Sequence, residues 1–101
     1  MVKYDKMIVK RSDKAGKKYV AIFTDSSSGR KKETNFGDSS ATDYLLSKEK
    51  DRRDRYIQRH KKDLTTNDPT RAGFLSYYLL WGESTSLRTN ISAYKKRFGF
   101  K

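Results

Sequence analysis

Apolar positions along the chain follow two different spacings, and the change of spacing divides the sequence into a strand-rich first third and a helical remainder. Residues 7–9 (MIV) and 19–23 (YVAIF) are short apolar runs separated by a polar, glycine-containing stretch, which is typical of strands joined by a turn. The turn formers DSSSG at 25–29 precede a stretch, 31–36, that can return as a third strand before Gly37. We therefore expect a small antiparallel meander within residues 1–37.

A polar helix is expected next, beginning at Thr42 or Ser47 and running to about Lys62. Its apolar residues lie near its two ends, so only short patches should touch a core. Several of its acidic and basic residues have the i to i+4 spacing that supports an exposed helix. We expect its acidic side chains to form salt bridges on the surface. They are Glu49, spaced to pair with Arg53, Asp51, spaced to pair with Arg55, and Asp54.

The segment 72–82, AGFLSYYLLWG, is apolar and aromatic almost all round, in contrast to the rest of the chain. It is too short to cross a bilayer, which needs roughly 20 apolar residues, so we expect it to be the core of a small domain or a docking surface. Asp68 followed by Pro69 predicts a helix start, and the helix should run to Trp81 and end at Gly82. Docking would need an outward aromatic face, with Tyr77 or Tyr78 exposed.

A third helix is predicted after Thr85, ending at Gly99. Its apolar positions recur every three or four residues and form one stripe, namely Leu87, Ile91, Tyr94 and Phe98. The fold class is therefore α+β, a single domain over residues 1–101 in which a β-meander (1–37) precedes three helices (42–99) with the middle one buried. The side chains expected to anchor the fold or a docked partner are Phe74, Tyr78, Trp81, Leu87, Ile91 and Phe98.

The net charge of the chain indicates which kinds of partner it could bind. The chain holds 24 Lys and Arg against 12 Asp and Glu, a formal net charge of +12. Such an excess favours polyanions, which include nucleic acid, anionic lipid head groups and acidic protein surfaces. With no Cys and a single His, disulfides and thiolate metal sites are excluded and structural zinc is disfavoured, so no metal or cofactor is expected. No transmembrane segment or secretory signal is expected either.

Three groups of cations are candidates for polyanion contact, although a solvated surface is the ordinary alternative for each. The first group would lie on the hairpin, with two lysines across from a basic loop; the second forms a stripe on the polar helix; the third lies in the last turn of the third helix, where cations complement the helix dipole. They are, in order, Lys17, Lys18, Arg30, Lys31 and Lys32; Arg52, Arg55, Arg59 and the neighbouring Lys62; and Lys95, Lys96 and Arg97.

Catalytic residues are not apparent. His60 is the only imidazole, and we expect it at the core edge beside Tyr56 and Leu64. Residue types found at phosphodiester-transfer sites do occur around it, but as neighbours on one helix rather than converging from separate segments. The aromatic residues of the segment 72–82 could stack on unpaired bases, although within an apolar helix they read more naturally as core. We therefore expect a non-enzymatic protein.

A resemblance adds a biological context. The order of motifs is similar to that of a family of small, basic, uncharacterised proteins encoded by nucleocytoplasmic large DNA viruses that infect algae and amoebae. The chain departs from the family pattern at Leu75, where an aromatic residue is usual, and in residues 64–68, which lack a Trp. The matching residues are Lys18 and Tyr19; Phe36 and Gly37; Tyr56, Arg59 and His60; Ala72, Gly73 and Phe74; Leu79, Leu80 and Trp81; and Arg97, Phe98 and Gly99.

The resemblance implies a structural, non-enzymatic component of a virus particle. Such a protein would be a minor capsid or core-associated element that contacts larger viral structural proteins and a polyanion. It would lie in the virion, and in host cytoplasm or nucleus during assembly. The alternative is a free-standing nucleic-acid-binding protein without sequence preference. A third hypothesis is a small phosphodiester-processing enzyme whose cleavage depends on a metal or on Tyr56.

Overall fold

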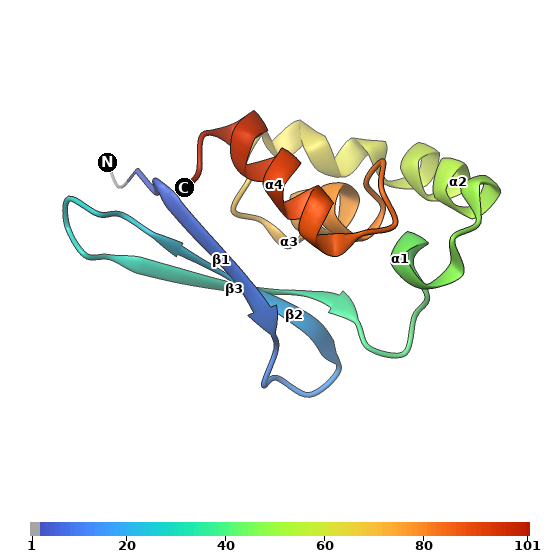
Figure 1. Cartoon of the computed structure of the whole chain (residues 1–101), viewed down its shortest axis with the longest axis horizontal. Helices are drawn as coiled ribbons and strands as arrows, with labels where there is room; N and C mark the ends of the chain where they lie inside the picture. The colour runs from blue at the N-terminus through green and yellow to red at the C-terminus, as the bar shows by residue number, and fades with distance from the viewer. Residues whose placement is uncertain (1–2) are drawn as a thin grey trace.

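The fold is a three-stranded antiparallel sheet followed by helices, which confirms the predicted α+β class. A computed structural model describes residues 3–101, and in it the strands neighbour one another in chain order. Figure 1 shows the helices gathered on one side of the sheet, with α1 and α2 beyond one end of it. The strands are β1 (Lys6–Arg11), β2 (Lys17–Thr24) and β3 (Lys31–Asp38); the helical elements are α1 (Tyr44–Ser47), α2 (Lys50–His60), η1 (Lys61–Thr66), α3 (Ala72–Leu75), η2 (Ser76–Leu80) and α4 (Leu87–Phe98).

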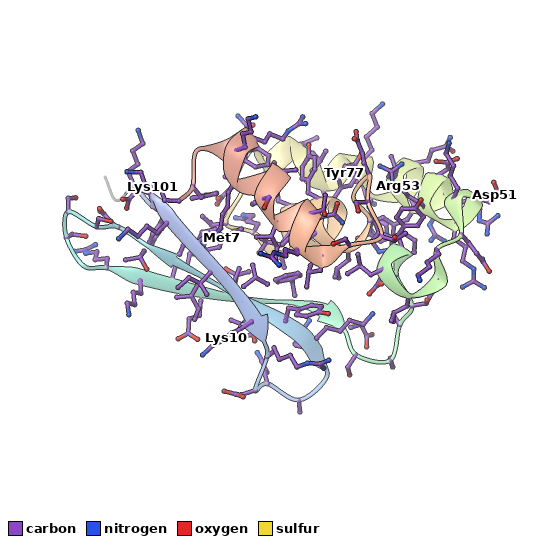
Figure 2. The ribbon with its side chains drawn as sticks, viewed as in Figure 1. Met7, Lys10, Asp51, Arg53, Tyr77 and Lys101 are labelled. Atoms are coloured by element: carbon purple, nitrogen blue, oxygen red, sulfur yellow. The ribbon has the colours of Figure 1, made fainter. Side chains whose placement is uncertain are left out.

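The two faces of the sheet differ as the alternation of side chains requires. Met7 pairs with Phe23 in the β1–β2 ladder, and both side chains are fully buried against the helices. The adjacent Ile8 is 60% exposed on the opposite face. In Figure 2 Met7 points from β1 toward the helices and Lys10 points away from them. A half-buried antiparallel sheet of this kind has one solvated face.

The register of the β2–β3 hairpin corrects the expected arrangement of its cations. Lys17 lies opposite Asp38, whereas Lys31 lies opposite Thr24 at the other end of the same ladder. Lys17 and Lys18 therefore do not face the basic loop, because an antiparallel hairpin places the start of one strand beside the end of the other. Figure 1 shows the loop that follows β2 projecting past the helices, far from α2.

The predicted polar helix is broken in two. Asp43, rather than Thr42 or Ser47, caps α1, since its side chain accepts a hydrogen bond from the Leu46 amide. Lys48 then adopts φ 55°, ψ 21°, a left-handed conformation that ends α1 before α2 begins at Lys50. The chain continues from α2 into η1, so helical structure extends to Thr66.

The apolar segment is buried as predicted, but its helix starts later and changes type. The Asp68 carboxylate accepts hydrogen bonds from the Thr70 amide and hydroxyl, which forms a turn, and α3 begins only at Ala72. The helix then widens to the π form in η2, where the Trp81 amide donates to the Ser76 carbonyl. Its buried side chains are Phe74, Leu75, Leu79, Leu80 and Trp81.

The helical segment ends directly before Gly82, as predicted, with Trp81 as its C-cap, and Gly82 also permits close packing there. A Cβ at this position would lie 2.2 Å from the Tyr78 carbonyl oxygen and 2.9 Å from the side chain of Asn90. Asn90 is itself buried on α4, and its amide donates to the carbonyls of Leu79 and Ser84. A polar side chain missed by the apolar pattern thus holds the end of the π turn against the last helix.

The last helix is confirmed, with Ser86 in place of Thr85 as its cap and Gly99 in the left-handed conformation at its end. Tyr94 is the fully buried member of its stripe, and its hydroxyl donates to the Pro69 carbonyl. The chain then returns to the sheet, where the Lys101 backbone pairs with Asp5 and Met7 beside β1. No helix within residues 3–101 has the length and apolar character needed to span a membrane.

Candidate polyanion-binding groove

A hollow of about 480 Å³ is lined by residues from the end of β3, from α2 and from the π turn η2. Four cations line it, one from β2 and three from α2, together with the aromatic rings of Tyr56 and Trp81. We call this hollow the basic groove. Its lining residues are Lys18, Gly37, Asp38, Ala41, Thr42, Asp43, Arg52, Arg55, Tyr56, Arg59, His60, Ser76, Leu80 and Trp81.

One face of α2 supplies the arginines. Arg52, Arg55 and Arg59 are separated by three and four residues, so they lie along one side of the helix and all line the groove. Lys62, the fourth member of the predicted stripe, belongs to η1 and is not among the lining residues. All three arginines are exposed, and α2 has no buried residue at all. Arg52 pairs with Glu49 (Nε to Oε2, 2.7 Å), while the predicted pairs Glu49–Arg53 and Asp51–Arg55 are not formed among residues 3–101.

Arg53 faces the other way and fixes α2 in place. Its Nε lies 2.7 Å from the Gly82 carbonyl oxygen and 3.2 Å from that of Trp81, and donates to both. These are carbonyls left without helical partners where η2 ends. Its guanidinium also lies over the Tyr44 ring, 5.7 Å from the centroid. Figure 2 shows Arg53 directed from α2 toward the neighbouring segment, whereas Asp51 points away from the molecule.

Three stacked rings form the aromatic part of the groove. The Tyr56 ring lies parallel to Trp81, with 4.4 Å between centroids and 6° between planes, and its other face carries His60 at 4.1 Å and 22°. Trp81 is 8% exposed, so the column starts in the core. It ends at His60, whose side chain is 40% exposed and whose Nδ1 lies 3.1 Å from an Asp63 carboxylate oxygen. The expected place of His60 at the core edge is confirmed.

Burial in this column raises the pKa of Tyr56 to about 12. The phenol is therefore neutral at physiological pH. A tyrosine nucleophile needs an activated hydroxyl, which means a depressed pKa or an adjacent base, and the environment of Tyr56 acts in the opposite direction. The ring serves packing and stacking.

Lys18 forms the opposite wall and is committed to an ion pair. Its Nζ lies 2.6 Å from Asp43 Oδ2, and the two side chains are 14% and 3% exposed. The same carboxylate caps α1, so one aspartate ties the sheet to the start of the helical region. Because Asp43 neutralises its charge, Lys18 adds little to the positive charge of the groove.

Gly37 lies next to Lys18 in the same wall. It has φ +80° and packs against Leu80, where a Cβ would approach to 2.9 Å.

A second acidic group lies at the rim. Asp38 is exposed, and hydrogen bonds from the Ser40 amide and hydroxyl lower its pKa, so it is ionised at neutral pH. The charges of Lys18 and Asp43 cancel each other. Three arginines then remain against two carboxylates, Asp38 and the Arg52 partner Glu49, so the local charge at the groove is slightly positive in a protein of net charge +12.

The other predicted cations do not line the groove and belong to the β2–β3 hairpin and α4. Arg30 and Lys31 are exposed at the hairpin tip, while Lys32 donates to the Thr70 hydroxyl at 2.8 Å. At the end of α4, Arg97 lies over Tyr78, 5.0 Å from the ring centroid. The remaining members are Lys17, at the exposed start of β2, and Lys95 and Lys96 on α4.

The predicted anchors are mostly used in packing. Phe74 and Trp81 are buried, and the half-buried Tyr78 contacts the rings of Phe74, Tyr94 and Phe98, so it is not free for docking. Leu87 and Ile91 are half-buried against the same core. Tyr77 is half-buried and lines a second hollow of about 360 Å³.

Sequence reasoning missed the roles of Tyr56, His60 and Asp43 in the groove. The signal was present for the first two, since Tyr56 and His60 have the same four-residue spacing as their neighbours Arg55 and Arg59. For Asp43 there was none, because its partner lies on β2, 25 residues earlier in the chain.

Residues 7–60 match the model of a family of unknown function, DUF5754. The chain belongs to this family. The matched region runs from β1 to the end of α2, and so includes Lys18 and the arginine face but not Trp81. No curated protein and no solved structure matched the chain. Within residues 3–101 no three acidic or histidine side chains are grouped as metal ligands.

Proposed function

We propose that this DUF5754 protein binds nucleic acid through the basic groove, by contacts to phosphates and without a chemical step. The observation that carries the proposal is the face of α2, where three exposed arginines line a hollow. Guanidinium groups suit phosphate oxygens because they donate paired hydrogen bonds in a fixed plane. Contacts of this kind position a backbone but carry no sequence information.

The charge of the whole chain supports the same proposal. A net charge of +12 attracts a polyanion from a distance, and the groove offers a site where its phosphates can bind. The cations at the hairpin tip and on α4 stand on separate parts of the surface, and we assign them to this long-range attraction. We propose binding rather than cleavage because the Tyr56 ring is stacked between Trp81 and His60, where burial also raises its pKa.

The test is the salt dependence of binding to a short DNA duplex, measured by fluorescence anisotropy. Affinity should fall with a log-log slope of roughly −0.9 for each phosphate neutralised. The groove variant Arg52→Gln/Arg55→Gln/Arg59→Gln should flatten the slope by about 2 to 3 units. A control, Arg30→Gln/Lys31→Gln/Lys96→Gln, removes the same charge elsewhere and should flatten it less. Equal losses in both variants, or no binding by the wild type near physiological salt, would overturn the proposal.

The resemblance to proteins of large DNA viruses leads us to propose a setting for this binding. In a virus particle the polyanion would be packaged DNA, and larger structural proteins would lie on the other side of the protein. Cross-linking mass spectrometry on purified particles tests this setting, and cross-links to capsid or core proteins are the expected result. Absence from particles combined with abundance in infected cells would remove it, while leaving the proposed binding in place.

A further inference from the structure

The column of Trp81, Tyr56 and His60 is unfinished at its outer end. Tyr56 has a ring on each face, but among residues 3–101 no further ring stacks on the outer face of His60. The imidazole is 40% exposed and lines the basic groove beside Arg59. A flat aromatic group in the groove would therefore find a stacking surface next to a phosphate-binding cation.

The imidazole is also held in position before any ligand arrives. Its Nδ1 interacts with Asp63 on η1, and Tyr56 supports its inner face. Tyr56 is in turn pressed on the largely buried Trp81, which belongs to the core. A surface fixed in this way costs little conformational entropy when a ring stacks on it.

We infer that the groove binds single-stranded nucleic acid, with one unpaired base stacked on His60 as the fourth ring of the column. This inference rests on the proposed function, because the arginines of α2 must hold the phosphates beside that base. Every nucleobase has a π face, so stacking adds affinity without selecting sequence. Bases within a duplex already stack on their neighbours, so a duplex offers the groove its phosphates alone.

The experiment compares two single-stranded 12-mers that differ only in their bases. One is oligothymidine, and the other is an abasic strand with the same phosphates and sugars. Wild-type protein should bind oligothymidine roughly 5- to 150-fold more tightly, the range expected for one stacked base. The variant His60→Ala should lose most of this preference, His60→Phe should keep it, and Arg59→Gln should weaken both strands alike. Circular dichroism checks that each variant is folded.

A second measurement needs no variant. His60 is the only histidine, so its imidazole proton resonances are unique in the NMR spectrum. Oligothymidine should shift them upfield through the ring current of the stacked base, and the abasic strand should not.

The outcomes separate the two proposals. Equal binding of both strands, or no upfield shift with oligothymidine, overturns base stacking and leaves phosphate binding intact. A preference for oligothymidine that survives in His60→Ala also overturns stacking on His60. If neither strand binds, phosphate binding by the groove fails together with the inference.

Discussion

Helix α2 and the segment 72–82 lie against each other but have opposite characters. The segment buries Phe74, Leu75, Leu79 and Leu80, and it packs between the sheet and α4. Helix α2 has no fully buried residue, and it contacts the segment through Arg53 and the stack of the partly buried Tyr56 on Trp81. One region therefore stabilises the fold, and the other is held in place to present charge.

This difference implies that stability and binding can be altered separately. The hydrophobic contribution to folding is roughly proportional to the apolar area removed from water, and the segment supplies much of that area. Arg52, Arg55 and Arg59 are exposed, so these three arginines contribute little to folding. Substitutions in the buried segment should lower the stability of the fold, and substitutions of the exposed arginines should lower the affinity for nucleic acid.

The largest effect is expected from Leu75→Ala. This side chain is fully buried, and removing it leaves a cavity in addition to the lost transfer free energy. The free energy of unfolding should fall by about 2–5 kcal/mol, measured by chemical denaturation. The control is Leu46→Ala, because Leu46 is 67% exposed and should change stability by less than about 0.5 kcal/mol. Similar losses at both positions would contradict the assignment of the core.

Arg53→Met tests the attachment of α2. It removes a charged donor from the carbonyls of Trp81 and Gly82 and should cost about 1.5–3 kcal/mol. Hydrogen exchange of the α2 amides should quicken more than that of the β2 amides. Arg52→Met is the matched control, since its exposed pair with Glu49 is worth less than about 1 kcal/mol. If both variants were equally stable, Arg53 would not anchor the helix.

The same contrast explains which parts of the structure could be predicted. Apolar runs and stripes report burial directly, so the strands, the buried segment and α4 were found from spacing alone. The break at Lys48 was missed because a left-handed lysine has no local signal, and α1 is held by the ion pair between Asp43 and Lys18. The positions of Lys17 and Lys31 follow from strand register, which the charges do not specify. The groove was predicted only as an arginine stripe, since Lys18 and Trp81 reach it through tertiary packing.

A smaller effect should appear at high pH. Burial raises the pKa of Tyr56 to about 12, so above pH 10 the unfolded chain loses this proton before the folded one does. Its contribution is therefore complete below pH 10 and declines as pH rises toward 12. Denaturation at pH 8 and pH 11 should show a larger fall for the wild type than for Tyr56→Phe. The pKa of Tyr94 is also raised by burial, so a smaller fall should remain in the variant. Identical falls would contradict the burial of Tyr56.

The smallest change in stability, and one that should separate the two regions, is expected from Glu49→Gln. Glu49 and Arg52 are both about half exposed, at 58% and 48%, so losing their pair should alter the free energy of unfolding by less than about 0.5 kcal/mol. DNA binding should nevertheless strengthen, because Arg52 is released and the negative charge paired with it is removed. The control Glu33→Gln makes the same change in net charge on the solvated face of β3. A steeper salt slope for Glu49→Gln alone is expected, by up to about 0.9 units. Equal responses would mean that net charge, and not the groove, governs binding.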